Sequence, residues 1–93
     1  MVIGVLHIDL FLSNSQSLKE KRMVLKSLKT RVRNNFNVAV SELDHHEKWQ
    51  KTSLGVLSIS NKKRHMDTIL SNVVEFINRE GGAEIIEYST ELL

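Results

Sequence analysis

Residues 17–33, SLKEKRMVLKSLKTRVR, decide how the rest of the chain can be arranged. At about 100° per residue, one arc of a helix over this segment collects its apolar side chains: Leu18, Val24, Leu25, Leu28 and Val32. A neighbouring arc collects cations at spacings of three and four: Lys19, Arg22, Lys26, Lys29 and Arg33. The segment therefore predicts an amphipathic helix in which a cationic stripe runs beside a core stripe.

The cationic stripe has two interpretations. Like charges at these spacings repel one another by a few tenths of a kcal/mol per pair, and an anion lying along the helix would remove that cost. RNA phosphates are one such anion. The alternative is an ordinary solvated, lysine-rich helix face, and the sequence leaves both interpretations open.

Length and composition predict one domain over residues 1–93. The chain has 41% hydrophobic residues and a net charge of +2, which is typical of a soluble globular domain. It contains no cysteine, which excludes disulfides and thiolate sites and fits a reducing compartment. It has no leader-like N-terminus and no apolar run near the roughly 20 residues of a membrane span. We expect a cytoplasmic protein with no membrane association.

Charge is distributed unevenly along the chain. From residue 67 to the end, Arg79 is the single Lys or Arg among six acids: Asp67, Glu75, Glu80, Glu84, Glu87 and Glu91. The first helix is almost purely basic. We therefore expect one cationic and one anionic side on the folded domain.

The periodic segments predict the order strand, helix, strand, strand, helix, strand. Strands are expected over residues 2–12, 36–44, 52–60 and 83–92. Ser15 or Ser17 caps the first helix, Asn34-Asn35 ends it, and a second helix runs from a Ser60 or Asn61 cap to Gly81-Gly82. This order predicts an α+β fold of the ferredoxin-like βαββαβ type, a four-stranded antiparallel sheet with two helices on one face.

That architecture leaves one face of the sheet open. The first strand presents alternate residues on this face: Ile3, Val5, His7, Asp9 and Phe11. Apolar side chains on an open face favour cover by a partner subunit or a ligand, and we expect a concentration-dependent homodimer. A few apolar residues simply left in water are the alternative.

Asp44, His45, His46 and Glu47 form the densest group of residue types used in catalysis and metal binding. Neighbours on a strand point to opposite faces, so a metal would need a third ligand such as His7 or Asp9. The chain has no HExxH spacing, no GxSxG elbow and no glycine-rich phosphate loop. We expect no enzyme activity, no cofactor and no metal, and a polar hairpin end whose side chains cap backbone groups.

Two further features can contribute to binding. Trp49, flanked by Lys48 and Lys51, can stack on a base or fold back as a lid on the core. Lys62, Lys63 and Arg64 begin the second helix, where cations oppose the helix dipole and so favour an external anion. A plain solvated cluster explains them equally well.

Four short pieces, QSLKEKR at residues 16–22, Asn37-Val38, Asp44-His45 and Trp49-Gln50, together resemble the YlxP-like family of small bacterial proteins. The matched positions are Ser17, Leu18, Lys19, Glu20, Lys21, Arg22, Asp44, His45, Trp49 and Gln50. The family is labelled a domain of unknown function. The resemblance implies a ferredoxin-like fold and, because members are often encoded beside translation and ribosome-maturation factors, a role in binding the ribosome.

The leading hypothesis is a non-enzymatic module that binds ribosomal RNA or a ribosomal subunit, in the role of a ribosome maturation factor. Its predicted RNA-binding residues are Lys19, Arg22, Lys26, Lys29, Arg33, Lys62, Lys63, Arg64 and Trp49. The alternative is a self-associating interaction or regulatory domain that uses the open sheet face. Salt distinguishes the two, because phosphate binding weakens with ionic strength and an apolar interface does not.

Overall fold

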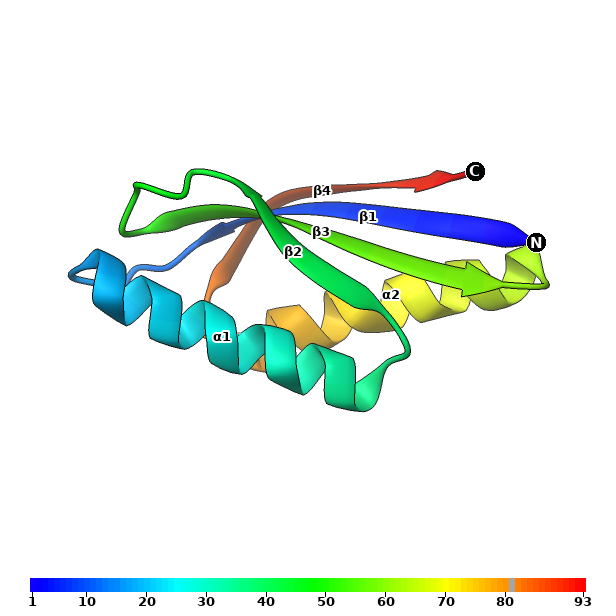
Figure 1. Ribbon diagram of the computed structural model, residues 1–93, viewed down its shortest axis with the longest axis horizontal. Coiled ribbons are helices and arrows are strands. Elements are labelled where there is room, and N and C mark those ends of the chain that lie inside the picture. The colour runs from blue at the N-terminus through cyan, green and yellow to red at the C-terminus, as the bar shows by residue number, and fades with distance from the viewer. Residues whose placement is uncertain (81) are drawn as a thin grey trace.

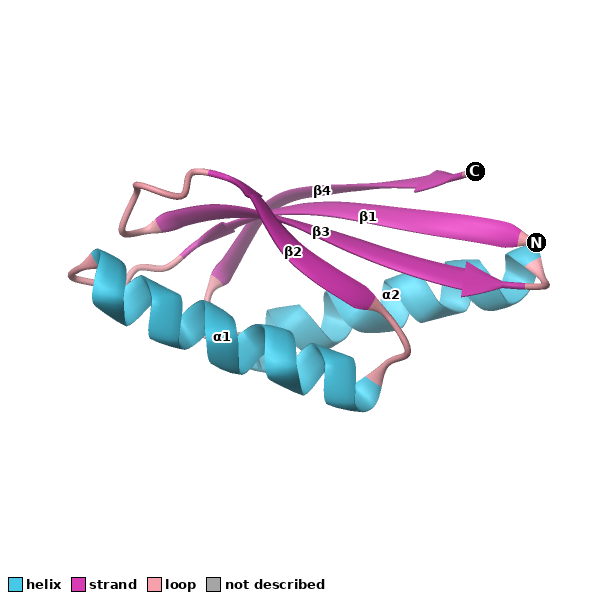
Figure 2. Cartoon of the chain, in the orientation of Figure 1, coloured by secondary structure: helices cyan, strands magenta, loops and turns pink. Residues whose placement is uncertain are grey.

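The computed structural model describes residues 1–80 and 82–93. Its elements, in order, are β1 (Val2–Phe11), α1 (Leu18–Asn35), β2 (Ala39–Asp44), β3 (Lys51–Ser60), α2 (Lys63–Glu80) and β4 (Glu84–Leu92). The strands form one sheet in the order β2-β3-β1-β4, and every neighbouring pair is antiparallel. Both helices lie on the same side of this sheet (Figure 1). The structure confirms the ferredoxin-like α+β prediction, as the cartoon in Figure 2 shows.

The core lies between the sheet and the helices. Three alternate residues of β1 and the residue that follows the strand are almost fully buried, as the strand pattern predicts: Leu6, Ile8, Leu10 and Leu12. Leu25, Leu28 and Val32 of α1 meet them, together with α2 residues such as Met66. Gly4 lets α2 come close to β1, because a Cβ at Gly4 would lie 2.2 Å from the Met66 sulfur.

The ends of α1 differ slightly from the prediction. Ser17 caps the helix, and its Oγ accepts a hydrogen bond from the Glu20 N–H at 3.1 Å. The Glu20 carboxylate accepts from the Gln16 N–H at 2.8 Å, one residue before the position expected of a capping box. The helix also includes both residues of the expected Asn34-Asn35 stop. Local capping signals therefore located the start of α1 better than its end.

The second strand is shorter than predicted. β2 begins at Ala39, and not at Phe36, because Phe36 caps the end of α1, where its N–H donates to the Val32 carbonyl at 2.9 Å. The Phe36 ring packs edge-to-face on Phe76, with centroids 5.7 Å apart. Of the predicted Gly81-Gly82 helix stop, Gly81 lies outside the described residues and Gly82 has a φ of +66°. Among the residues described, no helix combines the length and apolar character needed to cross a bilayer.

Candidate nucleic-acid interface

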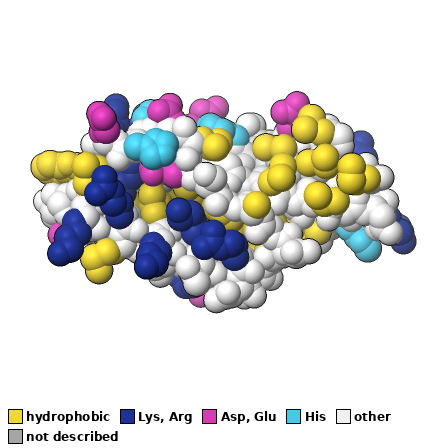
Figure 3. Space-filling model, viewed as in Figure 1, with side chains coloured by type: hydrophobic (Ala, Val, Ile, Leu, Met, Phe, Trp, Pro, Cys, Tyr) yellow, Lys and Arg dark blue, Asp and Glu magenta, His cyan; other side chains and the backbone are white. Residues whose placement is uncertain are grey.

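Four of the five cations of the predicted stripe on α1 are exposed, and Lys29 is half-buried. Arg31 lies on the opposite flank of α1, where its guanidinium donates to the Glu80 carbonyl at the end of α2. The cationic stripe (Lys19, Arg22, Lys26, Lys29 and Arg33) therefore lies on the flank turned away from α2. Figure 3 shows Lys and Arg side chains gathered over the part of the molecule where Figure 1 draws α1. The stripe extends for about 21 Å along the helix.

Lys21 differs from the other cations of α1 because its side chain is only 1% exposed. Its Nζ lies 2.9 Å from Glu42 Oε2 and donates a hydrogen bond to the His45 carbonyl. The same Glu42 oxygen accepts from the Thr52 hydroxyl at 2.7 Å. This Lys21 network (Lys21, Glu42, His45 and Thr52) joins α1 to β2, β3 and the loop between those strands. Lys21 is therefore a structural residue and not part of the exposed cationic stripe.

The Lys21 network also sets the ionisation of Glu42. Burial alone would raise the pKa of Glu42, but the Thr52 hydroxyl, the Lys21 ammonium and nearby His46 together outweigh it and hold the pKa below its ordinary value. A carboxyl with a lowered folded-state pKa stabilises the fold above its unfolded-state pKa. That stabilisation is lost as the pH falls through the folded-state value.

At pH values below about 4.3, we expect the free energy of unfolding to decrease as Glu42 takes up a proton. Glu42→Gln should be less stable than the wild type at neutral pH and should lose less stability on acidification. Urea denaturation from about pH 7 to about pH 3 measures both effects. Glu47→Gln, a matched change at an exposed carboxylate in the loop, should keep the wild-type slope. Equal slopes for wild type and Glu42→Gln would contradict this assignment.

The loop between β2 and β3 is held against the segment before α1. Gln50 Nε2 donates to the carbonyls of Ser13 at 3.2 Å and Ser15 at 3.1 Å. The Leu12 N–H donates to the Gln50 carbonyl at 2.8 Å. Trp49, next to Gln50, is thereby brought to the end of the molecule where α1 begins.

Trp49 is 54% exposed and lines a shallow hollow with Phe11 and the flanking Lys48 and Lys51. A side chain exposed to this extent does not close the core, so the lid interpretation is wrong. The structure therefore places an exposed aromatic ring between cations near the first turn of α1.

The basic cluster Lys62, Lys63 and Arg64 lies apart from this surface. All three side chains are exposed. They precede or begin α2 at the end of the molecule that carries the N-terminus, whereas α1 begins at the other end (Figure 1). A ligand that touches both cationic regions must extend along the molecule.

The group of residues from Asp44 to Glu47 does not converge on one point. Asp44 Oδ1 accepts from the His45 N–H at 2.7 Å, and this bond holds the pKa of Asp44 below its ordinary value. His45 adopts a positive φ of 66°, typical of a tight turn. His46 instead lies 3.9 Å from Glu42. Within residues 1–80 and 82–93, no three His, Asp or Glu side chains lie close enough together to hold a metal ion.

Residues 3–90 match the sequence profile described as a protein of unknown function, DUF503. The chain belongs to the DUF503 family. It is also 39% identical over 77 residues to the protein named uncharacterized protein YlxP of Bacillus subtilis (strain 168), an alignment that covers 83% of this chain and 84% of that one. These matches confirm the predicted family.

Two designed proteins resemble this DUF503 chain in structure. The De novo designed protein Ferredog-Diesel matches with a TM-score of 0.50 and 15% identity, over 96% of this chain and 83% of that one. The De novo designed protein Foldit4 matches with a TM-score of 0.49 and 13% identity, over 99% and 94%. At 15% identity, the similarity to Ferredog-Diesel shows a shared fold and nothing about function.

In this DUF503 chain, most residues that carry the family resemblance hold the fold together. Ser17 and Glu20 cap α1, Lys21 anchors the loop after β2, and Gln50 ties that loop to the segment before α1. The exposed members are Lys19, Glu20, Arg22, Asp44 and Trp49, of which Glu20 and Asp44 accept hydrogen bonds from backbone N–H groups. The resemblance therefore rests largely on a junction between α1 and the β2–β3 hairpin.

Sequence reasoning missed the Lys21 network, although signals for it were present. Lys21 stands four residues before Leu25 and seven before Leu28, on the core side of α1. Glu42 stands two residues after Val40, on the same face of β2. A cation and an acid, each at a core-facing position, are the pattern that predicts a buried ion pair.

Proposed function

We propose that this protein is a non-enzymatic RNA-binding module that holds structured RNA, in ribosomal RNA or a ribosomal subunit, along α1. One observation carries the proposal: within the described part of the chain, none of the five stripe cations takes part in an ion pair. Cations kept on one helix flank without carboxylate partners are suited to a row of phosphates. A cytoplasmic location is part of the proposal.

Trp49 adds a stacking surface beside the start of the stripe, where an unpaired base of a loop or bulge can rest on its ring. Lys62, Lys63 and Arg64 supply phosphate contacts at the far end of an extended RNA. The open face of the sheet takes no part, because its β4 side carries the carboxylates of Glu87 and Glu91, which repel phosphates.

The test is cosedimentation with purified ribosomal subunits over a series of salt concentrations. Binding through phosphates must weaken steeply as salt rises, with a slope set by the number of contacts. Crosslinking in cells, followed by sequencing of the bound RNA, then identifies the target. Binding that is insensitive to salt would reject the cationic stripe as the interface.

A second candidate function, self-association through the open sheet face, is favoured by an apolar patch on that face. The strand register groups Ile3, Val5, Ala39, Leu57 and Ile59, and Leu43 lies over Gly55 beside them. Leu43, Leu57 and Ile59 are 52%, 42% and 60% exposed. Phe11 lies at the other end of β1 and pairs with Lys51, so this patch differs from the expected one, which included Phe11.

Leu57 lies at the centre of the patch, between Val5 and Ala39, so Leu57→Glu should weaken self-association most. Burying about 300 Å² of apolar surface is worth roughly 7 kcal/mol before association entropy, so micromolar dimers are expected. Analytical ultracentrifugation should show them in both low and moderate salt. Met23→Glu, at an exposed apolar residue on α1, is the matched control and should dimerise like the wild type. A wild-type protein that stays monomeric at hundreds of micromolar would exclude this function.

A further inference from the structure

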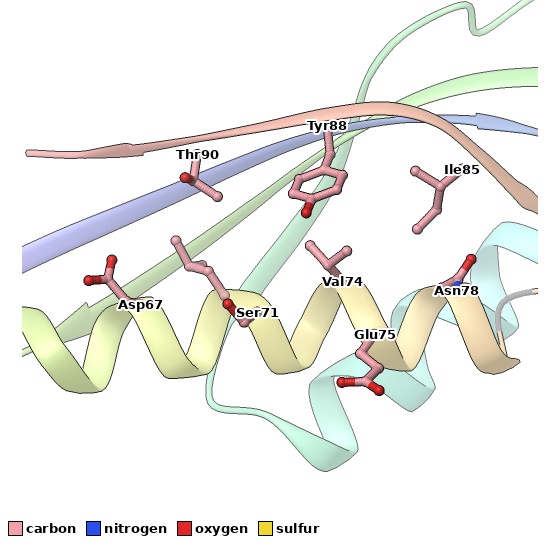
Figure 4. Close-up of a pocket in the computed structure, with 9 residues that line it drawn as sticks. Asp67, Ser71, Val74, Glu75, Asn78, Ile85, Tyr88 and Thr90 are labelled. Carbon is pink, nitrogen blue, oxygen red and sulfur yellow. The ribbon is translucent and has the colours of Figure 1, made fainter.

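The helix-covered face of the sheet is left partly uncovered at β4. Ile85, Tyr88 and Thr90 pair with the core residues of β1 and so face α2, yet Tyr88 is 52% exposed. Between β4 and α2 lies a groove of about 770 Å³. Figure 4 shows Tyr88 and Thr90 pointing across it toward α2, with Val74 below the tyrosine ring.

β4 is also an edge strand. Within residues 1–80 and 82–93, the sheet order places β1 on one side of it and no strand on the other, over nine residues. An edge strand presents backbone N–H and C=O groups that can accept a further strand. A groove along the side chains and a free backbone edge together fit an extended peptide.

The charges around β4 indicate what kind of peptide fits. Glu87 and Glu91 pair with Asp9 and Val5, so they lie on the open face. Asp67 and Glu75 of α2 line the groove on the opposite face. Within residues 1–80 and 82–93, none of these four carboxylates forms an ion pair. A strand added to β4 would therefore meet carboxylates on both of its faces.

We propose that a lysine- and arginine-rich segment of a partner protein adds to β4 as a fifth strand. One set of its side chains enters the groove, where separate cations meet the Tyr88 ring and the carboxylates of Asp67 and Glu75, which stand about 12 Å apart along α2. The other set lies beside Glu87 and Glu91 on the open face. This surface is separate from the cationic stripe and serves protein binding, not RNA binding.

The same charges disfavour the other occupants. RNA phosphates are repelled by these carboxylates, and pairing of two β4 edges from two copies would bring glutamates of like charge together. A basic strand gains attraction on both faces.

The probe is a fluorescent nine-residue peptide of Lys, Arg, Val and Thr in which the cations stand in adjacent pairs, so that each face of the strand carries cations. We expect a dissociation constant of about 10–100 µM by fluorescence anisotropy, and amide chemical-shift changes in β4 and α2 by NMR. Glu75→Lys and Glu87→Lys should each weaken binding about fivefold or more, because each turns an attraction into a repulsion. Glu47→Lys, the same charge change in the distant β2–β3 loop, should change affinity by less than about twofold.

A second peptide tests the strand pairing itself. Methylation of the backbone nitrogens that face β4 removes hydrogen-bond donors and leaves the charge unchanged, so binding should be lost. Equal binding of the methylated peptide, or equal weakening by Glu47→Lys, would reduce the effect to general charge attraction and overturn the proposal. Shifts in β4 that grow with protein concentration in the absence of peptide would assign the groove to a second copy and overturn it as well.

Discussion

Lys21→Met should lower the free energy of unfolding by about 3–5 kcal/mol. The substitution keeps much of the side-chain volume but leaves Glu42, whose side chain is 16% exposed, without its cation. It also removes the hydrogen bond to the His45 carbonyl. Urea denaturation at neutral pH, analysed with a common slope, measures the loss.

The control for this experiment is Lys19→Met, which removes the same charge from an exposed position of α1. It should change stability by less than about 0.5 kcal/mol. The double variant Lys21→Met with Glu42→Leu should recover a large part of the lost stability, because it also removes the Glu42 carboxylate that Lys21→Met leaves without a cation. A loss below about 1 kcal/mol for Lys21→Met alone would show that Lys21 contributes little to the fold.

Reversing the charge of three stripe residues, Arg22→Glu, Lys26→Glu and Lys29→Glu, should abolish association with ribosomal subunits. Each phosphate contact that is lost flattens the salt dependence by about one unit, and the new carboxylates repel the RNA. Cosedimentation at low salt measures the effect, and circular dichroism confirms that the variant is folded.

The matched comparison is the triple reversal of Lys62, Lys63 and Arg64, which makes the same change in net charge at the other end of the molecule. It should weaken association less, because these residues contribute only the outer contacts of the proposed surface. Equal loss from both triple variants would show that net charge, and not the stripe, determines binding. Full binding by the stripe variant would remove α1 from the interface.

Much of the fold follows from short-range patterns of apolar and charged residues that can be identified directly in the sequence. The alternation of Leu6, Ile8 and Leu10 identifies a strand with one buried face, because side chains two residues apart share a face wherever the strand lies. Helical spacing likewise places the five stripe cations on one flank of α1. These patterns depend on neighbours within about four residues.

The prediction was weakest where two distant segments compete for the same side chain. Phe36 continues the alternation of β2 in the sequence, but it caps the end of α1 and its ring packs on the distant Phe76. Trp49 gives no local sign of its exposure, which depends on the hydrogen bonds from Gln50 to the segment before α1. Long-range contacts of this kind cannot be deduced from periodicity.

By itself, then, the sequence determined the elements, their order and the face of each that is apolar, since these are set by the local geometry of the backbone. Helical spacing puts Lys21 on the core side of α1, but tertiary structure decided which acid and which carbonyl it meets. Lys21 and Lys19 stand two residues apart on one helix, yet packing buries Lys21 against Glu42 and leaves Lys19 in water. Packing likewise decided that α2 leaves the Tyr88 side chain partly uncovered. The position of a helix over a sheet depends on the fit of the whole core.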